Sequence, residues 1–251
     1  MKKAEEIEYL LRIADNSLVL GQRLGEWCGH GPVLEEDIAM TNISLDLIGQ
    51  ARILYAKIAE LEGGGKDEDF YAYRRDVFQF RNALLCEQPN GDFATTMARQ
   101  LYFSAFAAPF YQALTSSSNK DLAAFAAKSL KEVNYHLKHS RDWVIRLGDG
   151  TPESHDRMQA AINTLWMYTG ELLTEDELDA AAHGDGLGVD LSLVAASWEK
   201  IVASTLTEAT LTQPDSTWMQ TGGKRGQHSE HLGFMLAELQ FLPRAYPDAK
   251  W

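Results

Sequence analysis

Apolar residues recur three and four positions apart along almost the whole chain, which is the spacing of one face of an α-helix. The first amphipathic stretch ends before the turn 29–32, and a second begins with acidic residues near Glu35 and stops at the glycine run 63–65. No stretch alternates between apolar and polar residues long enough to predict a strand. The pattern therefore indicates an all-α protein.

The next helices follow from their caps and breakers. A shorter helix around 69–85 is followed by a third long helix at 93–117, in which Pro109 predicts a kink, and by a fourth at 121–147. Further helices are expected C-terminally. One covers residues 152–173, with Thr151 as its cap and Pro152 in its first turn. A short helix is expected where Thr174 and Glu177 have capping-box spacing, and two more cover residues 190–211 and 229–245.

Two pairs of long helices, separated by one long insertion, predict an antiparallel four-helix bundle with a single crossover. That connectivity is ferritin-like, with additional C-terminal helices. No linker rich in proline or serine divides the chain, so we expect one domain over residues 1–251.

Composition and charge limit the classes of function that this chain could have. Acidic residues outnumber basic ones by 36 to 23, and a net charge of −13 argues against nucleic acid as a partner. The apolar runs are too short for a membrane span and the N-terminus lacks a signal-like segment, so we expect a cytoplasmic protein. Cys28 and Cys86 fit reduced core residues better than a disulfide.

Ferritin-like di-iron centres take a carboxylate from each of two helices and a Glu-x-x-His pair from each of the other two. This chain contains no Glu-x-x-His or Asp-x-x-His, because the residue three positions before each histidine is not acidic. No acidic residue lies between Asp92 and Asp121, so the third long helix offers no carboxylate to a metal. Val133 is the inward neighbour of His136 and cannot bind a metal ion.

Four segments resemble the PaaC subunits of bacterial phenylacetyl-CoA ring-1,2-epoxidases, and the resemblance covers essentially the whole chain. It implies a ferritin-like structural subunit that pairs with a homologous di-iron catalytic subunit, PaaA. The partner's chemistry would join dioxygen, electrons from a separate NADPH-dependent reductase subunit, and an aromatic CoA thioester. The segments are RLGEWCGHGPVLEEDIAMTNISLDLIGQAR, LLCEQPNGDFATTMARQ, KEVNYHLKHSRDWV and TGGKRGQHSEHLGFMLAE.

The resemblance also implies which positions correspond to the metal ligands of the catalytic copy. KEVNYH keeps the histidine as His136 and has Val133 in the glutamate position, and LDLIGQ places Leu47 and Gln50 where glutamate and histidine would stand. Counting equal helix lengths assigns Ser17 and Ser104 to the remaining carboxylates. Five of the six positions thus offer iron no charge, so we expect a vestigial site, with no metal, cofactor or catalytic residue in this chain.

The histidines also suggest other chemistry. Glu132 and His136 have the spacing of an acid–base pair, but a structural hydrogen bond is the favoured interpretation. The pairs His136/His139 and His228/His231 could begin a zinc site only with further ligands such as Glu132 or Glu230. Solvated or hydrogen-bonded histidines explain both pairs better.

The glycine-rich loop 222–226 carries Lys224 and Arg225 just before a predicted helix. One hypothesis is contact with a CoA phosphate, although a surface loop or a contact with the partner is favoured. Asp15, Asp46 and Arg52 lie among apolar residues, where a buried polar network could replace the lost metal. Six helical aromatic residues are expected to fill the core, unless an exposed patch marks the partner interface. They are Phe106, Phe110, Trp143, Trp166, Tyr168 and Trp198.

Three functions are compatible with these features. The leading hypothesis is a noncatalytic scaffold that stabilises the iron-bearing subunit of a phenylacetyl-CoA epoxidase. The alternatives are a metalloprotein with an irregular ligand set, and a homodimer that binds a small hydrophobic ligand in the bundle centre. A homodimer of the isolated chain is compatible with the leading hypothesis too.

Overall fold

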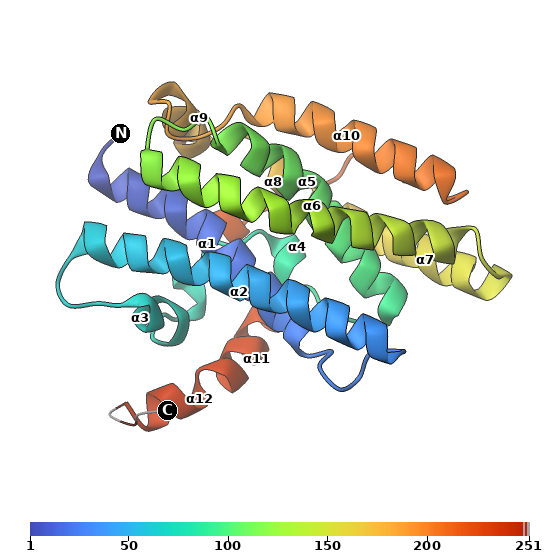
Figure 1. The fold of residues 1–251 in the computed structure, drawn as a ribbon, viewed down its shortest axis with the longest axis horizontal. Coiled ribbons are helices and arrows are strands. Elements are labelled where there is room, and N and C mark those ends of the chain that lie inside the picture. The colour runs from blue at the N-terminus through green and yellow to red at the C-terminus, as the bar shows by residue number, and fades with distance from the viewer. Residues whose placement is uncertain (248, 250–251) are drawn as a thin grey trace.

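The computed structural model describes residues 1–247 and Ala249, and within these residues every regular element is a helix (Figure 1). Two pairs of long helices form the bundle. The first pair is α1 (Lys3–Gly25) with α2 (Leu34–Glu62), and the second is α5 (Phe93–Leu114) with α6 (Lys120–Gly148). The predicted all-α, ferritin-like class is confirmed.

Each pair is antiparallel, and small or aromatic residues set the helix spacing. In the first pair Ser44 donates a hydrogen bond of 2.7 Å to the carbonyl of Gly21, where an added Cβ would lie 3.1 Å from Ile48. In the second pair Tyr111 packs edge-on against Phe125, with ring centroids 5.7 Å apart. Glycine lets α1 and α2 approach closely, whereas aromatic rings fill the space between α5 and α6.

The two pairs meet along a polar seam between α2 and α6, which lie side by side (Figure 1). Four side chains of α2 each pair with a side chain of α6. Successive pairs involve lower residue numbers on α2 and higher residue numbers on α6, so these two helices are also antiparallel. The pairs are Lys57–Asp121 (2.7 Å), Gln50–Glu132 (2.9 Å), Asp46–His136 (3.0 Å) and Glu36–His139 (2.8 Å).

The helix ends follow the sequence signals. Asp92 caps α5 by accepting the amide of Thr95 at 2.9 Å, and Asn119 caps α6. Gly63 ends α2 with a φ of 76°, a conformation that glycine adopts without strain. The α5 helix runs on through Pro109.

The crossover between α2 and α5 corrects one prediction. A single helix was expected over residues 69–85, but the structure has α3 (Glu68–Tyr73), a 3₁₀ helix η1 (Val77–Gln79) and α4 (Leu84–Glu87). The chain leaves the helix after Tyr73 so that Arg75 and the amide of Arg81 both reach Asp15. A continuous helix could not bring two groups six residues apart to one carboxylate.

Asp15 is buried completely and lies at the centre of a polar network that joins α1, α2 and the crossover. Its carboxylate accepts hydrogen bonds from Arg75 (3.0 Å), from the hydroxyl of Tyr55 and from the amide of Arg81 (2.7 Å). Burial alone would lower the pKa of Arg75, but the charge and hydrogen bonds of Asp15, together with Tyr55, outweigh burial and raise the pKa, so the guanidinium stays charged. A buried polar network does surround Asp15, but its cation is Arg75 and not the expected Arg52.

The other two residues expected in that network lie elsewhere. Arg52 is 75% exposed in its side chain and pairs with Glu68. Asp46 pairs with His136 at the edge of the seam. Both residues face away from Asp15 because they lie on the outer side of α2, which the hydrophobic pattern alone did not distinguish.

The C-terminal half covers α5 and α6 and then leaves the bundle. The indole of Trp198 donates to the carbonyl of Tyr102 at 2.9 Å, which holds the helix that contains Trp198 against α5. Figure 1 shows the last two helices outside the four-helix bundle, beyond α3. The elements are α7 (Pro152–Trp166), α8 (Gly170–Leu173), α9 (Glu177–Gly184), α10 (Leu191–Glu208), η2 (Gly223–Arg225), α11 (Glu230–Leu239) and α12 (Phe241–Ala245).

Three predicted boundaries in this half are wrong. The helix expected to reach residue 173 ends at Trp166, whose carbonyl accepts the hydroxyl of Thr169 at 2.8 Å, a local bond that competes with the helix. The cap of α9 is Asp176 instead of Thr174, since Asp176 accepts the amides of Leu178 and Asp179. The last helix breaks at Gln240, whose amide turns inward to the carbonyls of Ala72 and Arg75.

The aromatic prediction is confirmed, because all six residues lie in the core or pack against it. Tyr102, Trp166 and Trp198 form a cluster with ring centroids 5.7 to 5.9 Å apart. Both cysteines are free thiols, but Cys28 is exposed and only Cys86 belongs to the core. Among the described helices, none has an apolar stretch long enough to cross a bilayer.

Replacing Arg75 with Met should lower the free energy of unfolding by about 3 to 5 kcal/mol, because the Asp15 charge remains buried without its cation. The double variant Asp15→Leu/Arg75→Met should lose less than the sum of the two single changes. Urea unfolding measures both, and Arg52→Met is the exposed control, with an expected change within about 0.5 kcal/mol. Equal losses for Arg75→Met and Arg52→Met would contradict the role of the network.

Candidate functional site

The six positions that the resemblance assigns to metal ligands all lie inside the bundle. None of these side chains belongs to a residue more than 2% exposed. Burial is therefore retained at positions where a catalytic copy would need it, although the residue types have changed. The six are Ser17, Leu47, Gln50, Ser104, Val133 and His136.

Gln50 is the centre of a hydrogen-bond chain between Tyr111 and Glu132. Its amide donates to Glu132 at 2.9 Å, and its carbonyl oxygen accepts the hydroxyl of Tyr111 at 3.2 Å. Burial raises the pKa of Tyr111, while the neighbouring Ser17 hydroxyl acts in the opposite direction, so Tyr111 stays protonated and donates. Side chains of α1, α2, α5 and α6 thus meet here without a buried cation.

The remaining positions make only local or apolar contacts. Ser17 donates to the carbonyl of Ile13 at 3.2 Å, and Ser104 accepts from Gln100 at 2.9 Å. Leu47 and Val133 belong to the hydrophobic core. Hydroxyl groups bonded along their own helix and aliphatic side chains are poor ligands for iron.

His136 is the one imidazole among the six, and its partner is Asp46. The ring Nε2 lies 3.0 Å from the Asp46 carboxylate, which is about one third exposed. Glu132 bonds to Gln50 instead of His136, so the acid–base pair suggested by their spacing does not form. Asp46–His136 is a structural bond across the seam.

The donor set does not fit a di-iron centre. Such a centre needs four carboxylates and two histidines facing one space, whereas these positions supply one histidine, two hydroxyls, one amide and two aliphatic groups. Within the described residues, no three His, Cys, Asp or Glu side chains gather as metal ligands. The same finding gives no support to a zinc site at His136/His139 or at His228/His231.

The other two interior histidine contacts are also pairs with a single carboxylate. His139 lies 2.8 Å from Glu36 on α2, and His228 lies 2.8 Å from Glu87 on α4. Each pair joins segments that are distant in sequence. These histidines hold elements together in the structure.

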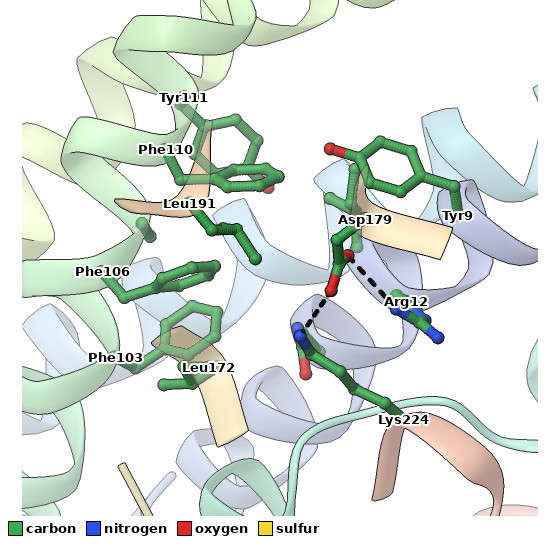
Figure 2. Close-up of a pocket in the computed structure, with 13 residues that line it drawn as sticks. Tyr9, Arg12, Phe103, Phe106, Phe110, Tyr111, Leu172, Asp179, Leu191 and Lys224 are labelled. Carbon is green, nitrogen blue, oxygen red and sulfur yellow. Dashed lines mark hydrogen bonds and ion pairs between the residues drawn. The ribbon is translucent and has the colours of Figure 1, made fainter. Parts of the chain in front are cut away.

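A cavity of about 40 Å³ lies on the other side of the bundle, between α1, α5 and the C-terminal elements. Figure 2 shows aromatic side chains of α5 on one wall and a polar wall opposite. This space suits a few water-sized groups, and it is much smaller than the cavity of about 150 Å³ that holds benzene. Its labelled lining includes Phe103, Phe106, Phe110, Leu191, Tyr9, Arg12, Asp179 and Lys224.

The side chains of the two basic residues of the glycine-rich loop have different surroundings in the structure. Lys224 turns inward, where its ammonium group donates to Asp179 at 2.9 Å and to the carbonyl of Thr174 at 3.0 Å (Figure 2 shows the former). Asp179 also pairs with Arg12 at 3.2 Å. Lys224 is thus committed to an internal ion pair, while Arg225 is exposed.

Sequence reasoning missed Tyr111 and the pairing of Gln50 with Glu132. Tyr111 lies seven residues, or two helical turns, after Ser104, so helical spacing alone places it on the same face of α5. The partner of Gln50 had no such signal, because it depends on the register between α2 and α6.

Replacing Tyr111 with Phe should lower the free energy of unfolding by about 1 kcal/mol, because the Gln50 carbonyl loses its buried donor. Tyr9→Phe is the matched control. The Tyr9 hydroxyl is also buried and has no hydrogen-bond partner in the described part of the chain, with only the amide of Val189 nearby. Thermal unfolding of both variants checks this, and a greater loss for Tyr9→Phe would contradict it.

Comparison with known proteins identifies the family of this chain. The family model for phenylacetic acid catabolic proteins, PaaA_PaaC, matches residues 1–251. The chain is 51% identical over 243 residues to one of the subunits of the 1,2-phenylacetyl-CoA epoxidase of Escherichia coli (strain K12), covering 97% of this chain and 98% of that protein. This chain therefore belongs to the PaaA/PaaC family of phenylacetic acid catabolic proteins.

Proposed function

We propose that this chain is the noncatalytic structural subunit of a multicomponent di-iron monooxygenase that epoxidises the ring of phenylacetyl-CoA in phenylacetate catabolism. The observation that carries the proposal is the 51% identity over 97% of the chain to a subunit of a phenylacetyl-CoA epoxidase. The six ligand positions support the noncatalytic part, since they lack every carboxylate of a di-iron set.

In this proposal iron belongs to the homologous subunit, PaaA, and electrons come from NADPH through a separate reductase subunit. Our chain binds no cofactor and works in the cytoplasm. It stabilises the PaaA bundle, and the isolated chain can pair with itself through the same surface. The net charge of −13 and the internal pairing of Lys224 favour another subunit as the site of the CoA phosphates.

A scaffold needs an exposed apolar surface, and the outer side of α2 supplies one. Leu34 and Leu45 are 72% and 61% exposed, and Ile38 and Ile53 continue the same side of the helix. Gly49 lies between them with no atom within 4 Å of an added Cβ, so another helix could approach the backbone there. We name Leu34, Ile38, Leu45, Gly49 and Ile53 the α2 stripe.

The α2 stripe suits a helical partner of the same family. Tyr135 on the neighbouring α6 is also about half exposed, and large aromatic residues are enriched at the centre of protein interfaces. An apolar stripe beside an aromatic residue on two adjacent long helices presents the ridges and grooves that another helix pair can fill. Stripes of this kind usually mark interaction sites.

Replacing Leu45 with Lys should weaken binding to the iron-bearing subunit about tenfold or more, because a charge enters the proposed interface. The epoxidase activity of the reconstituted complex at limiting protein concentration should fall with it. Titration of the two purified proteins against each other by calorimetry measures the binding.

Leu193→Lys is the matched control, because Leu193 is 67% exposed on α10, away from α2. Both variants should keep the unfolding temperature of the parent chain. Normal binding and activity for Leu45→Lys would refute the α2 stripe as the interface. A complex that is equally active without this chain would refute the scaffold function itself.

A further inference from the structure

The segment after the glycine-rich loop includes a histidine whose side chain is buried against the bundle. His228 precedes α11, and both of its ring nitrogens face acceptors. Nδ1 lies 2.8 Å from the carboxylate of Glu87, and Nε2 lies 3.0 Å from the carbonyl oxygen of Phe80. Neither partner can donate, since one is a carboxylate and the other a backbone carbonyl.

A neutral imidazole carries one N–H and can satisfy one of these acceptors, whereas the imidazolium satisfies both. We propose that protonated His228 is a pH-sensitive latch that holds the C-terminal segment, residues 226–245, against α4 and the crossover. Loss of the proton leaves two lone pairs facing each other and weakens that attachment. Side-chain exposure of both His228 and Glu87 is 0%, so water does not replace the lost bond.

The charges around the latch favour the imidazolium. Glu87 also accepts the amide of Ser229 at 2.6 Å and the side-chain amide of Asn82 at 2.9 Å, but neither donor carries a positive charge. Arg23 on α1 donates to the backbone carbonyls of Glu87 and His231, and its charge is paired with Glu26 at 2.8 Å. His228 is therefore the cation that offsets the buried Glu87 carboxylate.

Other charged groups that face this region are already paired, including Arg81, which donates to the same Phe80 carbonyl at 2.8 Å and pairs with Glu8. Asp15 on α1 adds to the negative field at His228 and is bonded to Arg75. Glu171 on α8 accepts the amides of Gly222 and Lys224 at 2.8 and 3.2 Å, which holds the start of the loop without a titrating partner. Only the His228 contact changes its protonation near neutral pH.

The sign of the effect follows from the pKa of His228. Burial alone would lower it, but the hydrogen bond and charge of Glu87, followed by the bond to Phe80, raise it above 6.5. A raised pKa means that the latch is complete below pH 6.5 and is lost as the pH rises through the folded-state value. Between those two values the opening constant should rise about tenfold for each pH unit.

The rest of the segment provides contacts that do not titrate in this range. Leu232, Met235 and Leu236 are buried, and Gln240 donates to Ala72 and Arg75. The bundle should therefore remain folded while the segment opens. Release would expose the buried faces of α11 and leave the α2 stripe untouched.

Hydrogen exchange of the full chain, measured by mass spectrometry from pH 6.0 to 9.0, tests the latch. After correction for intrinsic exchange, amides of residues 226–240 should lose protection as the pH rises, while α5 and α6 stay unchanged. His228→Gln should lack this pH dependence, because Gln does not titrate.

His231→Gln is the control in the same segment, since the ring of His231 makes no hydrogen bond with any described residue. It should keep the parent dependence. Protection that is flat with pH in the parent chain, or that varies equally in His228→Gln, would overturn the latch. If His228→Gln does not fold, nitrogen NMR of the parent decides the matter, because a neutral His228 ring at pH 6.5 refutes the proposal.

Discussion

The buried carboxylate of Asp15 constrains the architecture more than any other single group. It is fully removed from water, so it requires a cation and several donors, and these come from the crossover between the two helix pairs. Arg75 and the amide of Arg81 can both reach Asp15 only if the crossover is not one continuous helix. The path of the crossover then places Glu87 beside α1 and creates the surface against which the C-terminal segment packs.

The centre of the bundle accommodates its buried polar groups in a different way. A di-iron site would concentrate negative charge there and would be stable only with bound metal, as unpaired buried carboxylates are costly. Here Gln50 links the Tyr111 hydroxyl to the half-buried Glu132 carboxylate. In the proposed scaffold role, packing and these hydrogen bonds stabilise the centre of the bundle.

Much of this fold was predictable because helical periodicity, caps and glycine stops are local properties. The four long helices and the antiparallel pairing follow from them, as does the Thr151 cap of α7. The broken helix at 69–85 was not predictable, since its cause is a contact between Asp15 and Arg75, sixty residues apart. Asp176 displaced Thr174 as a cap for a similar reason, because Arg12 of α1 binds it at 2.7 Å.

The candidate site also has features that could be predicted from the sequence and features that could not. Absence of Glu-x-x-His and of acids on α5 could be read directly from the chain, and the resemblance assigned all six ligand positions, each of which is buried. The actual partners of Gln50, His136 and Lys224 could not be predicted. They depend on the register between helices, which is set by packing over the whole bundle and has no local signature.

The central claim is that this chain supports a metal centre in its partner and does not hold one itself. The most direct test is elemental analysis of iron per chain after anaerobic loading of the purified chain with ferrous ion, with His136→Ala as a second sample. Our account predicts iron near background in both samples. About two irons per chain, lost on changing His136, would contradict it, because that is the content of a di-iron bundle.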